Sequence, residues 1–588
     1  MLDVLLEFRI ALEPELGGET HDRRSAGADT AGQIRDGAEG KQGGLGKHRL
    51  RDTPLRGREL SADRRDQIQN GCFRARYVHI VTLAQRYRAM CYIIADGNTK
   101  TGSDVATAGR YVPTEREQAF LDTIESPKHD RQTINGLKPF LQDTAPPEFR
   151  GFYSRDELSA LASVKGTERD VEARMPVKVT GHFFELARNS KPLQRLVKAS
   201  PDETLNLAGS EDPGYQMDFA PVEGLLHKYE MGLVYAVSTC SAHCRFCYRE
   251  ELISQKEVER QDGTVAKKGL AKIKDVTDYI REHNRIVAAN GGLHPETGRE
   301  KLREVLLSGG DPMVLPNRKV GAWMAALAEA GVESIRIGTK EMSFFPKRFD
   351  EAFLSMLDNF HQTYPDIGFR LMIHFNHPDE FLLKDADGAY LTNPNGSLKW
   401  HEDTRKAMEG ITSRGWVNVE NQAPIIKGIN DDPDALRVMQ RALYRVGIGN
   451  HYFFCGRDIV AYRAFNVPIE TAWNILNESQ KGLSGVETHA RLSITHYKGK
   501  TEVAAVTNEP LHGIPGSENG VVIFKILRNA LDAPDRGKVC IVGRNPDAIW
   551  FDDYEHRVIF DEAGLYDYGR VDKKIVEIDE AVEAAVGH

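Results

Sequence analysis

The chain has 588 residues, a formal net charge of -9, and a composition that is 40% hydrophobic and 28% charged. These values are typical of a globular protein with a large core and predict two or three domains. The mixed charge argues against a nucleic-acid binder. No apolar run is long enough to span a bilayer, and seven cysteines are too few for a disulfide framework. We therefore expect a cytoplasmic protein.

The N-terminal part of the chain differs in composition from the rest. Residues 17–70 are rich in Gly, Arg, Asp and Ala, and no aromatic residue lies between Phe8 and Phe73. Such a stretch buries too little apolar surface to offset the entropy of folding. We predict that residues 1–112 are a disordered tail or spurious upstream sequence, without a signal peptide. Residues 113–225 are predicted to form a mostly helical region, in which Ser154 caps the helix "SRDELSALAS".

Residues 226–508 alternate between short strand-like runs and longer helix-like segments. The strand-like runs include "GLVYAVS", "REVLLSGG", "SIRIGT" and "FRLMIHFN", and the helix-like segments include "IKDVTDYIREHNRIVAAN" and "DPDALRVMQRALYRVG". This alternation predicts an α/β fold of parallel βα units, closed or partly closed into a barrel, with the site at the C-terminal ends of the strands. Residues 509–588 are predicted to form a small C-terminal α+β segment that ends in the helix "KKIVEIDEAVEAAVGH".

Three cysteines follow the first of these strands in the segment "STCSAHCRFCYREE". Cys240, Cys244 and Cys247 have the spacing C-x3-C-x2-C. A Cys3His zinc site that includes His243 is the simpler alternative, but structural zinc usually joins two separate pairs of ligands. The cysteines that could supply a second pair, but form none, are Cys72, Cys91, Cys455 and Cys540. We favour a [4Fe-4S] cluster in which one iron lacks a protein ligand and can bind a substrate or cofactor.

This spacing, with an aromatic residue before the last cysteine ("CRFC"), resembles the signature of radical S-adenosylmethionine (SAM) enzymes. Residues 170–510 resemble the lysine 2,3-aminomutase family more closely. The segments that resemble its motifs, in the family's order, are "GLLHKYEMGLVYAVSTCSAHCRFCYRE", "LLSGGDPMVL", "IRIGTK", "HFNHPDEF" and "NQAPIIKGIND". The resemblance implies a partial (βα) barrel of the radical SAM type. It also implies an amino-acid 2,3-aminomutase, an isomerase that moves an amino group from C2 to C3.

The resemblance also implies a set of cofactors and their ligands. The three cysteine thiolates would hold the [4Fe-4S] cluster, and SAM would chelate its open iron. The residues implied to contact SAM are Gly309, Gly310, Asp311, His374 and Gln422. Taken alone, "GGDP" is an ordinary turn sequence and His374 an ordinary core histidine. A flavodoxin or ferredoxin would supply the electron that starts SAM cleavage.

Pyridoxal 5'-phosphate (PLP) is the third cofactor that the resemblance implies. In the family a lysine that follows a glycine run holds PLP. Here the run is reduced to Gly499 before Lys500, with Lys498 as the nearest competitor and a solvated basic turn as the plain alternative. Lys228 and Tyr229 match the family's basic and aromatic pair near the PLP phosphate.

Departures from the family concern the substrate. Arg249 matches the arginine that binds the substrate carboxylate, a task that suits its planar guanidinium. Lysine-specific members recognise the distal ammonium with two aspartates. At the first position this chain has Arg457, with Asp458 next to it, and at the second, residues 493–496, it has no acid. A guanidinium favours a carboxylate over a cation. We therefore expect an acidic or neutral amino-acid substrate, unless the register places Asp458 in the pocket.

Two alternative functions remain open. Because the glycine run is missing, the chain could be a PLP-independent radical SAM enzyme of the same fold, or one that acts on a protein-bound residue. It could also be a non-catalytic metal-binding scaffold. We expect no zinc, since the sequence has no C-terminal cysteine cluster. We expect no nucleic-acid or membrane partner, and we leave a homo-oligomer open.

Overall fold

The computed structural model describes residues 111–127, 129–137, 151–167, 169–204, 208–254, 257–259, 263–530 and 536–566, all of which belong to the unit Thr101–His588. Two of the predictions lie outside these residues: nearly all of the N-terminal extension 1–112, and the C-terminal helix at 573–588. Within the described ranges, no helix combines the length and apolar character that a membrane crossing requires.

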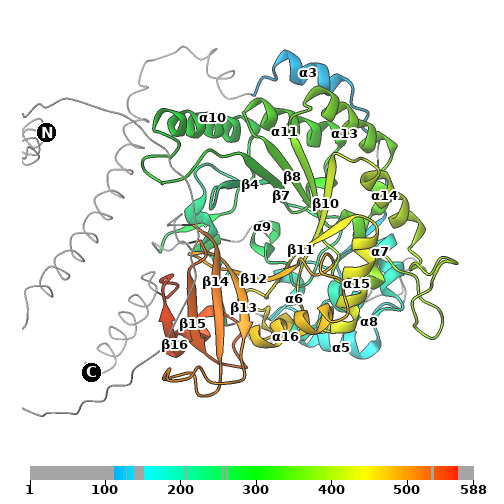
Figure 1. Cartoon of the computed structure of the whole chain (residues 1–588). Helices are drawn as coiled ribbons and strands as arrows, with labels where there is room; N and C mark the ends of the chain where they lie inside the picture. The colour runs from blue at the N-terminus through cyan, green and yellow to red at the C-terminus, as the bar shows by residue number, and fades with distance from the viewer. Residues whose placement is uncertain are drawn as a thin grey trace, which may run out of the picture. The chain divides into compact units, whose positions relative to one another are not determined.

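A 12-stranded sheet forms the centre of the described structure (Figure 1). Its parallel strands, in spatial order, are β4 (Met231–Val237), β7 (Glu304–Gly309), β8 (Ser334–Thr339), β9 (Gly368–Ile373), β10 (Val417–Pro424), β11 (Ile448–Phe454) and β12 (Arg491–Thr495). Spatial order follows chain order. Because these strands are parallel, their C-terminal ends lie together at one end of the sheet. The predicted mixed α/β fold with a parallel-rich sheet is confirmed.

Helices connect the parallel strands. The connecting helices are α10 (Ile273–Ala289), α11 (Asn317–Glu329), α13 (Glu351–Thr363), α14 (Glu402–Thr412), α15 (Pro433–Arg445) and α16 (Ile469–Gln480). Figure 1 shows α10, α11 and α13 in a row outside the strands, where α11 contacts both neighbours. Ile335 and Ile337 of β8 are fully buried, because helices cover parallel strands and leave little of them exposed to water. The sequence patterns indicated each of these helices except α13.

Antiparallel strands extend both edges of the sheet. β3 (Leu225–Leu226) pairs with β4 at one edge. At the other edge follow β13 (Gly499–Val506), β14 (Val521–Asn529), β15 (Val539–Gly543) and β16 (Val558–Asp561). The described C-terminal strands therefore continue the main sheet through β13 and do not form a sheet of their own.

The residues before the sheet form helix α3 (Glu115–Asp122), which packs on α11 and α13 as part of the main core, and then a smaller layer with its own core. The elements that follow α3 are β1 (Thr133–Asn135), α5 (Arg155–Val164), α6 (Val171–Arg174), β2 (Lys178–Thr180), α7 (Gly181–Ala187), α8 (Lys191–Val197), η2 (Pro201–Thr204) and η3 (Gln216–Phe219). Ser154 caps α5 as predicted, since its side chain accepts a hydrogen bond from Glu157 N. Ala242 and Phe246 of the cysteine segment belong to the same core, so this layer packs against the cysteines.

Short elements complete the connections near the edge where the parallel strands end. They are α9 (Glu250–Ser254), β5 (Glu257–Glu259), β6 (Val265–Lys267), η4 (Pro312–Val314), α12 (Glu341–Phe344), η5 (Pro346–Arg348), η6 (Pro378–Glu380), η7 (Arg463–Phe465) and η9 (Phe551–Arg557). Several of them carry the side chains described next.

Candidate active site

A cavity of about 340 Å³ lies at the C-terminal ends of the parallel strands. Its walls come from β4, β7, β8, β9, β10, β11, β12 and β13 and from the loops that follow them. All of the site residues predicted from the sequence line this cavity: Lys228, Tyr229, Cys240, Cys244, Cys247, Arg249, Gly309, Gly310, Asp311, His374, Gln422, Arg457 and Lys500. Residues up to 272 positions apart in the chain therefore meet at the place where an α/β sheet usually holds its ligand.

The cysteine loop between β4 and α9 is held by the N-terminal layer. Lys178 Nζ donates a hydrogen bond to Cys240 O at 2.6 Å, and His243 N donates to Lys178 O at 2.9 Å. Cys247 N donates to Cys244 O at 3.1 Å, so the second half of the loop is a tight turn. The three thiols are free and face the cavity.

Arg245, inside the cysteine motif, is the strongest of these anchors. Its guanidinium is almost fully buried and binds both carboxylate oxygens of Glu203, with Nε at 3.1 Å from Oε1 and Nη2 at 2.8 Å from Oε2. It also donates to Met175 O at 2.8 Å and to Val171 O at 3.3 Å. Sequence reasoning missed this role, although an arginine between two predicted cluster ligands was a usable signal.

The zinc alternative requires the three cysteines and His243 to converge on one point. His243 has its Nδ1 at 2.8 Å from Pro176 O, a contact that a zinc-bound histidine also makes with its second ring nitrogen. Among the described residues, no group of three or more His, Cys, Asp or Glu side chains converges on one metal position. A zinc ion needs its ligands at about 2.0–2.3 Å from one point, whereas a [4Fe-4S] cluster binds each thiolate through a different iron.

Burial raises the pKa of each of these thiols, that of Cys247 to about 11. A bound cation would offset this effect, because a coordinating thiol is deprotonated. Without such a cation, the three cysteines are poor candidates for free thiolates.

Gly309 and Gly310 allow β7 to end against the start of the cysteine loop. Gly309 has φ +121, and a Cβ there would lie 2.1 Å from Val237 O. A Cβ on Gly310 would lie 2.3 Å from Thr239 O. The two backbones are joined by hydrogen bonds, from Gly310 N to Val237 O at 2.6 Å and from Asp311 N to Thr239 O at 2.9 Å. The glycines are therefore required by this contact, in addition to any approach to SAM.

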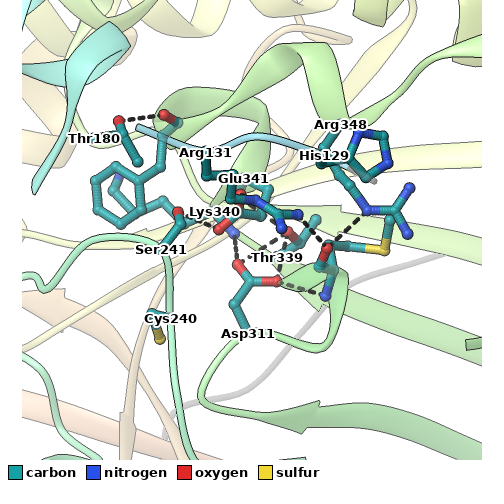
Figure 2. A network of polar contacts seen from close by, with 12 residues as sticks. His129, Arg131, Thr180, Cys240, Ser241, Asp311, Thr339, Lys340, Glu341 and Arg348 are labelled. Carbon is teal, nitrogen blue, oxygen red and sulfur yellow. Dashed lines mark hydrogen bonds and ion pairs between the residues drawn. The ribbon is translucent and has the colours of Figure 1, made fainter. Parts of the chain in front are cut away.

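Asp311 belongs to a buried polar network beside Cys240, which Figure 2 shows. Its carboxylate accepts hydrogen bonds from Thr339 Oγ1 at 2.9 Å, Lys340 N at 2.7 Å and Met313 N at 2.9 Å. Burial raises the pKa of Asp311. The carboxylate that the resemblance assigns to the SAM ammonium is thus already oriented by the protein.

Glu341, the first residue of α12, lies in the same network (Figure 2). It accepts a hydrogen bond from Ser241 Oγ, next to Cys240, and its Oε2 lies 3.4 Å from Arg131 Nε. Burial, and then the nearby Asp311 carboxylate, raises the pKa of Glu341 to about 7. Sequence reasoning missed Glu341 and Arg131, because nothing local marks residues 131 and 341 as neighbours.

His374 and Gln422 extend the site along β9 and β10. Burial lowers the pKa of His374 well below its usual value, and its Nε2 is buried without a hydrogen-bond partner in the described part of the chain. Lys340 Nζ holds the end of β9 through His374 O at 2.7 Å and binds Glu380 at 2.6 Å. Gln422 stands at a register shift between β10 and β11, which commonly redirects a side chain. A neutral imidazole with an unused nitrogen suits a polar ligand.

Lys500 lies in the cavity wall, whereas Lys498 does not. Lys500 Nζ lies over the rings of Tyr452, at 4.4 Å from the centroid, and Phe454, at 5.2 Å. Burial, followed by nearby arginines, lowers its pKa to about 7. Lys498 Nζ instead donates to Gly564 O at 3.1 Å. Of the two lysines considered as the PLP-binding residue, Lys500 is therefore the one that lies in the cavity wall.

Lys228 and Tyr229 differ in how free they are to bind a ligand. Lys228 Nζ donates to His496 O at 2.7 Å and to Gly214 O at 3.2 Å, so it joins two loops. Burial, and then Arg457, lowers the pKa of Lys228 to about 7. The hydroxyl of Tyr229 is buried without a hydrogen-bond partner among the described residues. Of the two side chains, Tyr229 is therefore the one whose polar group is more available to a ligand.

The two arginines predicted to bind substrate both reach the cavity. Arg249 Nη1 donates to Ser308 Oγ at 2.5 Å and to Gly309 O at 2.8 Å, and its buried Nε has no partner in the described residues. Across the described ranges, Arg457 has no ion-pair partner. The competing Asp458 binds Arg463 at 2.9 and 3.0 Å and is absent from the cavity wall. The register that places Arg457 in the pocket is therefore favoured.

The cavity wall is strongly basic. Its cationic side chains are Lys228, Arg249, Arg336, Lys340, Arg457 and Lys500. Among the described residues that line it, Asp311 is the one carboxylate, and its oxygens accept hydrogen bonds from the protein. At the predicted second position, Thr495 lines the wall and no acid does. Arg336 and Lys340 are already paired with Glu304 and Glu380, so Arg249 and Arg457 are the cations of this wall best placed to attract an anionic ligand.

A parallel sheet that carries three free cysteines and a Gly-Gly-Asp turn at its C-terminal edge defines a protein of the radical SAM class. No protein-family model matches the chain. It is 31% identical over 372 residues to a putative L-lysine 2,3-aminomutase of Aquifex aeolicus (strain VF5), a match that covers 62% of this chain and 83% of that protein. The chain therefore belongs to the lysine 2,3-aminomutase family, whose members are isomerases.

Other relatives differ in the substrate that their names give. The L-lysine 2,3-aminomutase of Acetoanaerobium sticklandii is 24% identical over 381 residues, which cover 63% of this chain and 78% of that protein. The glutamate 2,3-aminomutase of Clostridioides difficile (strain 630) is 25% identical over 268 residues, 45% of this chain and 52% of that protein. The family thus includes enzymes for a basic and for an acidic amino acid.

Proposed function

We propose that this chain is a radical SAM 2,3-aminomutase that acts on an acidic or neutral amino acid. The observation that supports this proposal is the cavity itself, whose wall includes the three cysteines together with Lys500, Arg249 and Arg457. The family supports the reaction type, since its named members are 2,3-aminomutases. The basic wall, with Arg457 where lysine-specific members have an acid, supports the substrate class.

The residues present fit the implied cofactors. Cys240, Cys244 and Cys247 would hold a [4Fe-4S] cluster with one open iron. The buried, unpaired Nε2 of His374 offers a hydrogen bond to SAM, together with the other residues assigned to it: Gly309, Gly310, Asp311 and Gln422.

Lys500 would hold PLP, and the unpaired hydroxyl of Tyr229 would be available to its phosphate. Lys228 would act there mainly by its charge, because its ammonium already binds two carbonyls. When bound, the cluster, SAM and PLP would supply the radical chemistry and the amine carrier that a 1,2-migration needs.

The protein's own side chains would orient the substrate. Arg249, fixed on β7 by Ser308 and Gly309, would bind the α-carboxylate and place C2 and C3. Arg457 would bind a distal carboxylate. A distal ammonium would meet the Arg457 guanidinium, while the nearby Asp212 carboxylate is already paired with Lys268. Such like-charge contacts cost several kcal/mol.

Lys500 and the apolar wall would complete the site. A pKa of about 7 keeps the Lys500 amine nucleophilic and able to hold or release a proton near neutral pH. Water would be excluded by apolar residues that include Leu226, Met231, Leu233, Leu306 and Met372. This combination matches a reaction that must protect a radical from solvent.

We further infer that residues 226–508 form the partial (βα) barrel of the radical SAM type. Residues 113–225 would then be an N-terminal region that supports the cysteine loop, and residues 509–588 a C-terminal segment added to the sheet. The parallel order β4 to β12 supports the barrel, whereas the antiparallel strands begin with β13 at Gly499, which lies within the range 226–508. A flavodoxin or ferredoxin would be the reductant.

Anaerobic reconstitution tests the proposal. The protein, reconstituted with iron, sulfide and PLP, is incubated with SAM, a reductant and a panel of amino acids, and β-amino acid products are separated by chromatography. We expect a β-amino acid from glutamate or a neutral amino acid, at a higher rate than from lysine. SAM cleavage without pyridoxal binding would support the PLP-independent alternative. Iron binding without SAM cleavage would reduce the chain to a metal-binding scaffold.

A further inference from the structure

Tyr248 lies between Cys247 and Arg249 and is 37% exposed. The guanidinium carbon of Arg249 lies 4.7 Å from the centroid of its ring, and that of Arg457 lies 4.6 Å from the same centroid. One aromatic ring thus contacts both proposed substrate arginines. These arginines come from the β4 and β11 ends of the sheet, which lie far apart in the chain.

The shared ring limits the distance between the two arginines. Since both guanidinium carbons lie close to one centroid, they are no more than about 9 Å apart. A bidentate pair places a carboxylate carbon about 4 Å from a guanidinium carbon. The two carboxylate carbons of an extended five-carbon diacid are about 5 Å apart. A short diacid can therefore reach both arginines at once.

The Tyr248 ring also contacts Arg457 where other cationic side chains lie nearby. Arg457 lies near Lys228 and Lys500, whose pKa values it helps to lower, and the nearby Asp212 carboxylate is already paired with Lys268. An aromatic face attracts guanidinium groups without bringing a negative charge. Their N–H groups then remain available for carboxylates, whereas an acidic side chain at residue 248 would occupy them.

We propose that Tyr248 is a specificity-determining positioning residue, which holds Arg249 and Arg457 as a pair that binds the two carboxylates of one short dicarboxylic amino acid. This inference rests on the proposed function and narrows its substrate class from acidic or neutral to dicarboxylic. The inference assigns the selectivity for a dicarboxylic amino acid to the Tyr248 ring, which need not contact the substrate itself.

Binding of simple acids to the full-length reconstituted protein tests this role. Glutarate and butyrate are titrated by calorimetry, since they differ by one carboxylate and neither can react. We expect the wild-type protein to prefer glutarate by roughly a hundredfold. Tyr248→Leu should reduce this preference about tenfold, because both ring contacts are lost. Tyr248→Phe, which keeps the ring, should stay within about twofold of wild type.

Control variants separate positioning from damage to the fold. Tyr444, exposed on α15 and absent from the cavity wall, gives the matched change Tyr444→Leu, which should leave the preference at the wild-type value. Arg457→Gln should remove the preference altogether. If Tyr248→Leu fails to fold, Tyr248→Met and Tyr248→Phe provide the same comparison.

Several outcomes would overturn the inference. An unchanged preference in Tyr248→Leu, an equal loss in Tyr248→Phe, or a wild-type protein that binds glutarate no better than butyrate would each do so. Failure of the proposed function would look different. The protein would then show no aminomutase turnover, while its preference for glutarate over butyrate would still fall in Tyr248→Leu.

Discussion

The buried pair between Arg245 and Glu203 predicts that the cysteine loop depends on a residue 42 positions earlier in the chain. Replacing Arg245 by Met removes three hydrogen bonds to the Glu203 carboxylate and the hydrogen bonds to Met175 O and Val171 O. It leaves Glu203, which is 4% exposed, without its cation. An uncompensated buried charge of this kind costs about 3–5 kcal/mol.

We expect the loss to appear first as loss of iron. The loop between Cys244 and Cys247 is anchored by Arg245, so the thiols would no longer be held in position for one cluster. Iron and sulfide analysis after anaerobic reconstitution should show well under half of the wild-type content, and the thermal midpoint should fall by several degrees.

A surface arginine and a double variant provide the controls. Arg405 pairs with Glu402 and Glu409 on the exposed face of α14 with 41% of its side chain exposed, so Arg405→Met should change stability by less than about 1 kcal/mol. The double variant Arg245→Met with Glu203→Leu should recover much of the lost stability, because no charge is left buried. Equal iron content and equal midpoints for Arg245→Met and Arg405→Met would refute the reasoning.

Three further predictions follow from the site. Replacing Cys240, Cys244 or Cys247 by Ala should abolish iron binding and SAM cleavage. Retention of about four irons per chain would contradict this set of ligands. Borohydride should fix a pyridoxyl group on Lys500, which peptide mapping can locate, and Lys498→Met should leave the labelling intact. Since burial lowers the Lys500 pKa to about 7, less of the amine is neutral below that pH, so PLP loading should increase as pH rises through about 7; a rise only near 10.5 would show an exposed amine. Arg457→Asp should reverse or weaken the preference for an acidic over a basic amino acid by roughly a hundredfold in kcat/KM, whereas Asp458→Asn should leave it within a few-fold; wild-type enzyme that converts lysine fastest would contradict the placement of Arg457.

The amino-acid sequence by itself determined the features that depend on local pattern. Alternating strand-like and helix-like segments are local signals, so the parallel strands from β4 to β12 and most of their helices were predictable. The Ser154 cap depends on residues three positions apart and was predictable for the same reason. The cysteine spacing and the motif order were sufficient for the family, and because parallel strands end at one edge, they placed the candidate residues together.

Tertiary structure decided which of several chemically equivalent side chains faces the cavity. Lys498 and Lys500 differ in sequence by two positions, yet one reaches the carbonyl of Gly564 and the other reaches the cavity. Asp458 is withdrawn from the pocket by Arg463, a partner that no motif announces. A side chain's direction depends on the packing and hydrogen bonds around it, and these come from residues that are distant in the chain.

The support of the cysteine loop was also hidden from sequence reasoning. Glu203 and Glu341 reach the loop from the N-terminal layer and from α12, at separations of 42 and 100 residues from their partners Arg245 and Ser241. No periodicity connects residues over such distances, because hydrogen bonds between separate elements form only when those elements pack. The motif therefore predicted the three cysteines as cluster ligands, and only the folded chain showed which residues hold their loop in place.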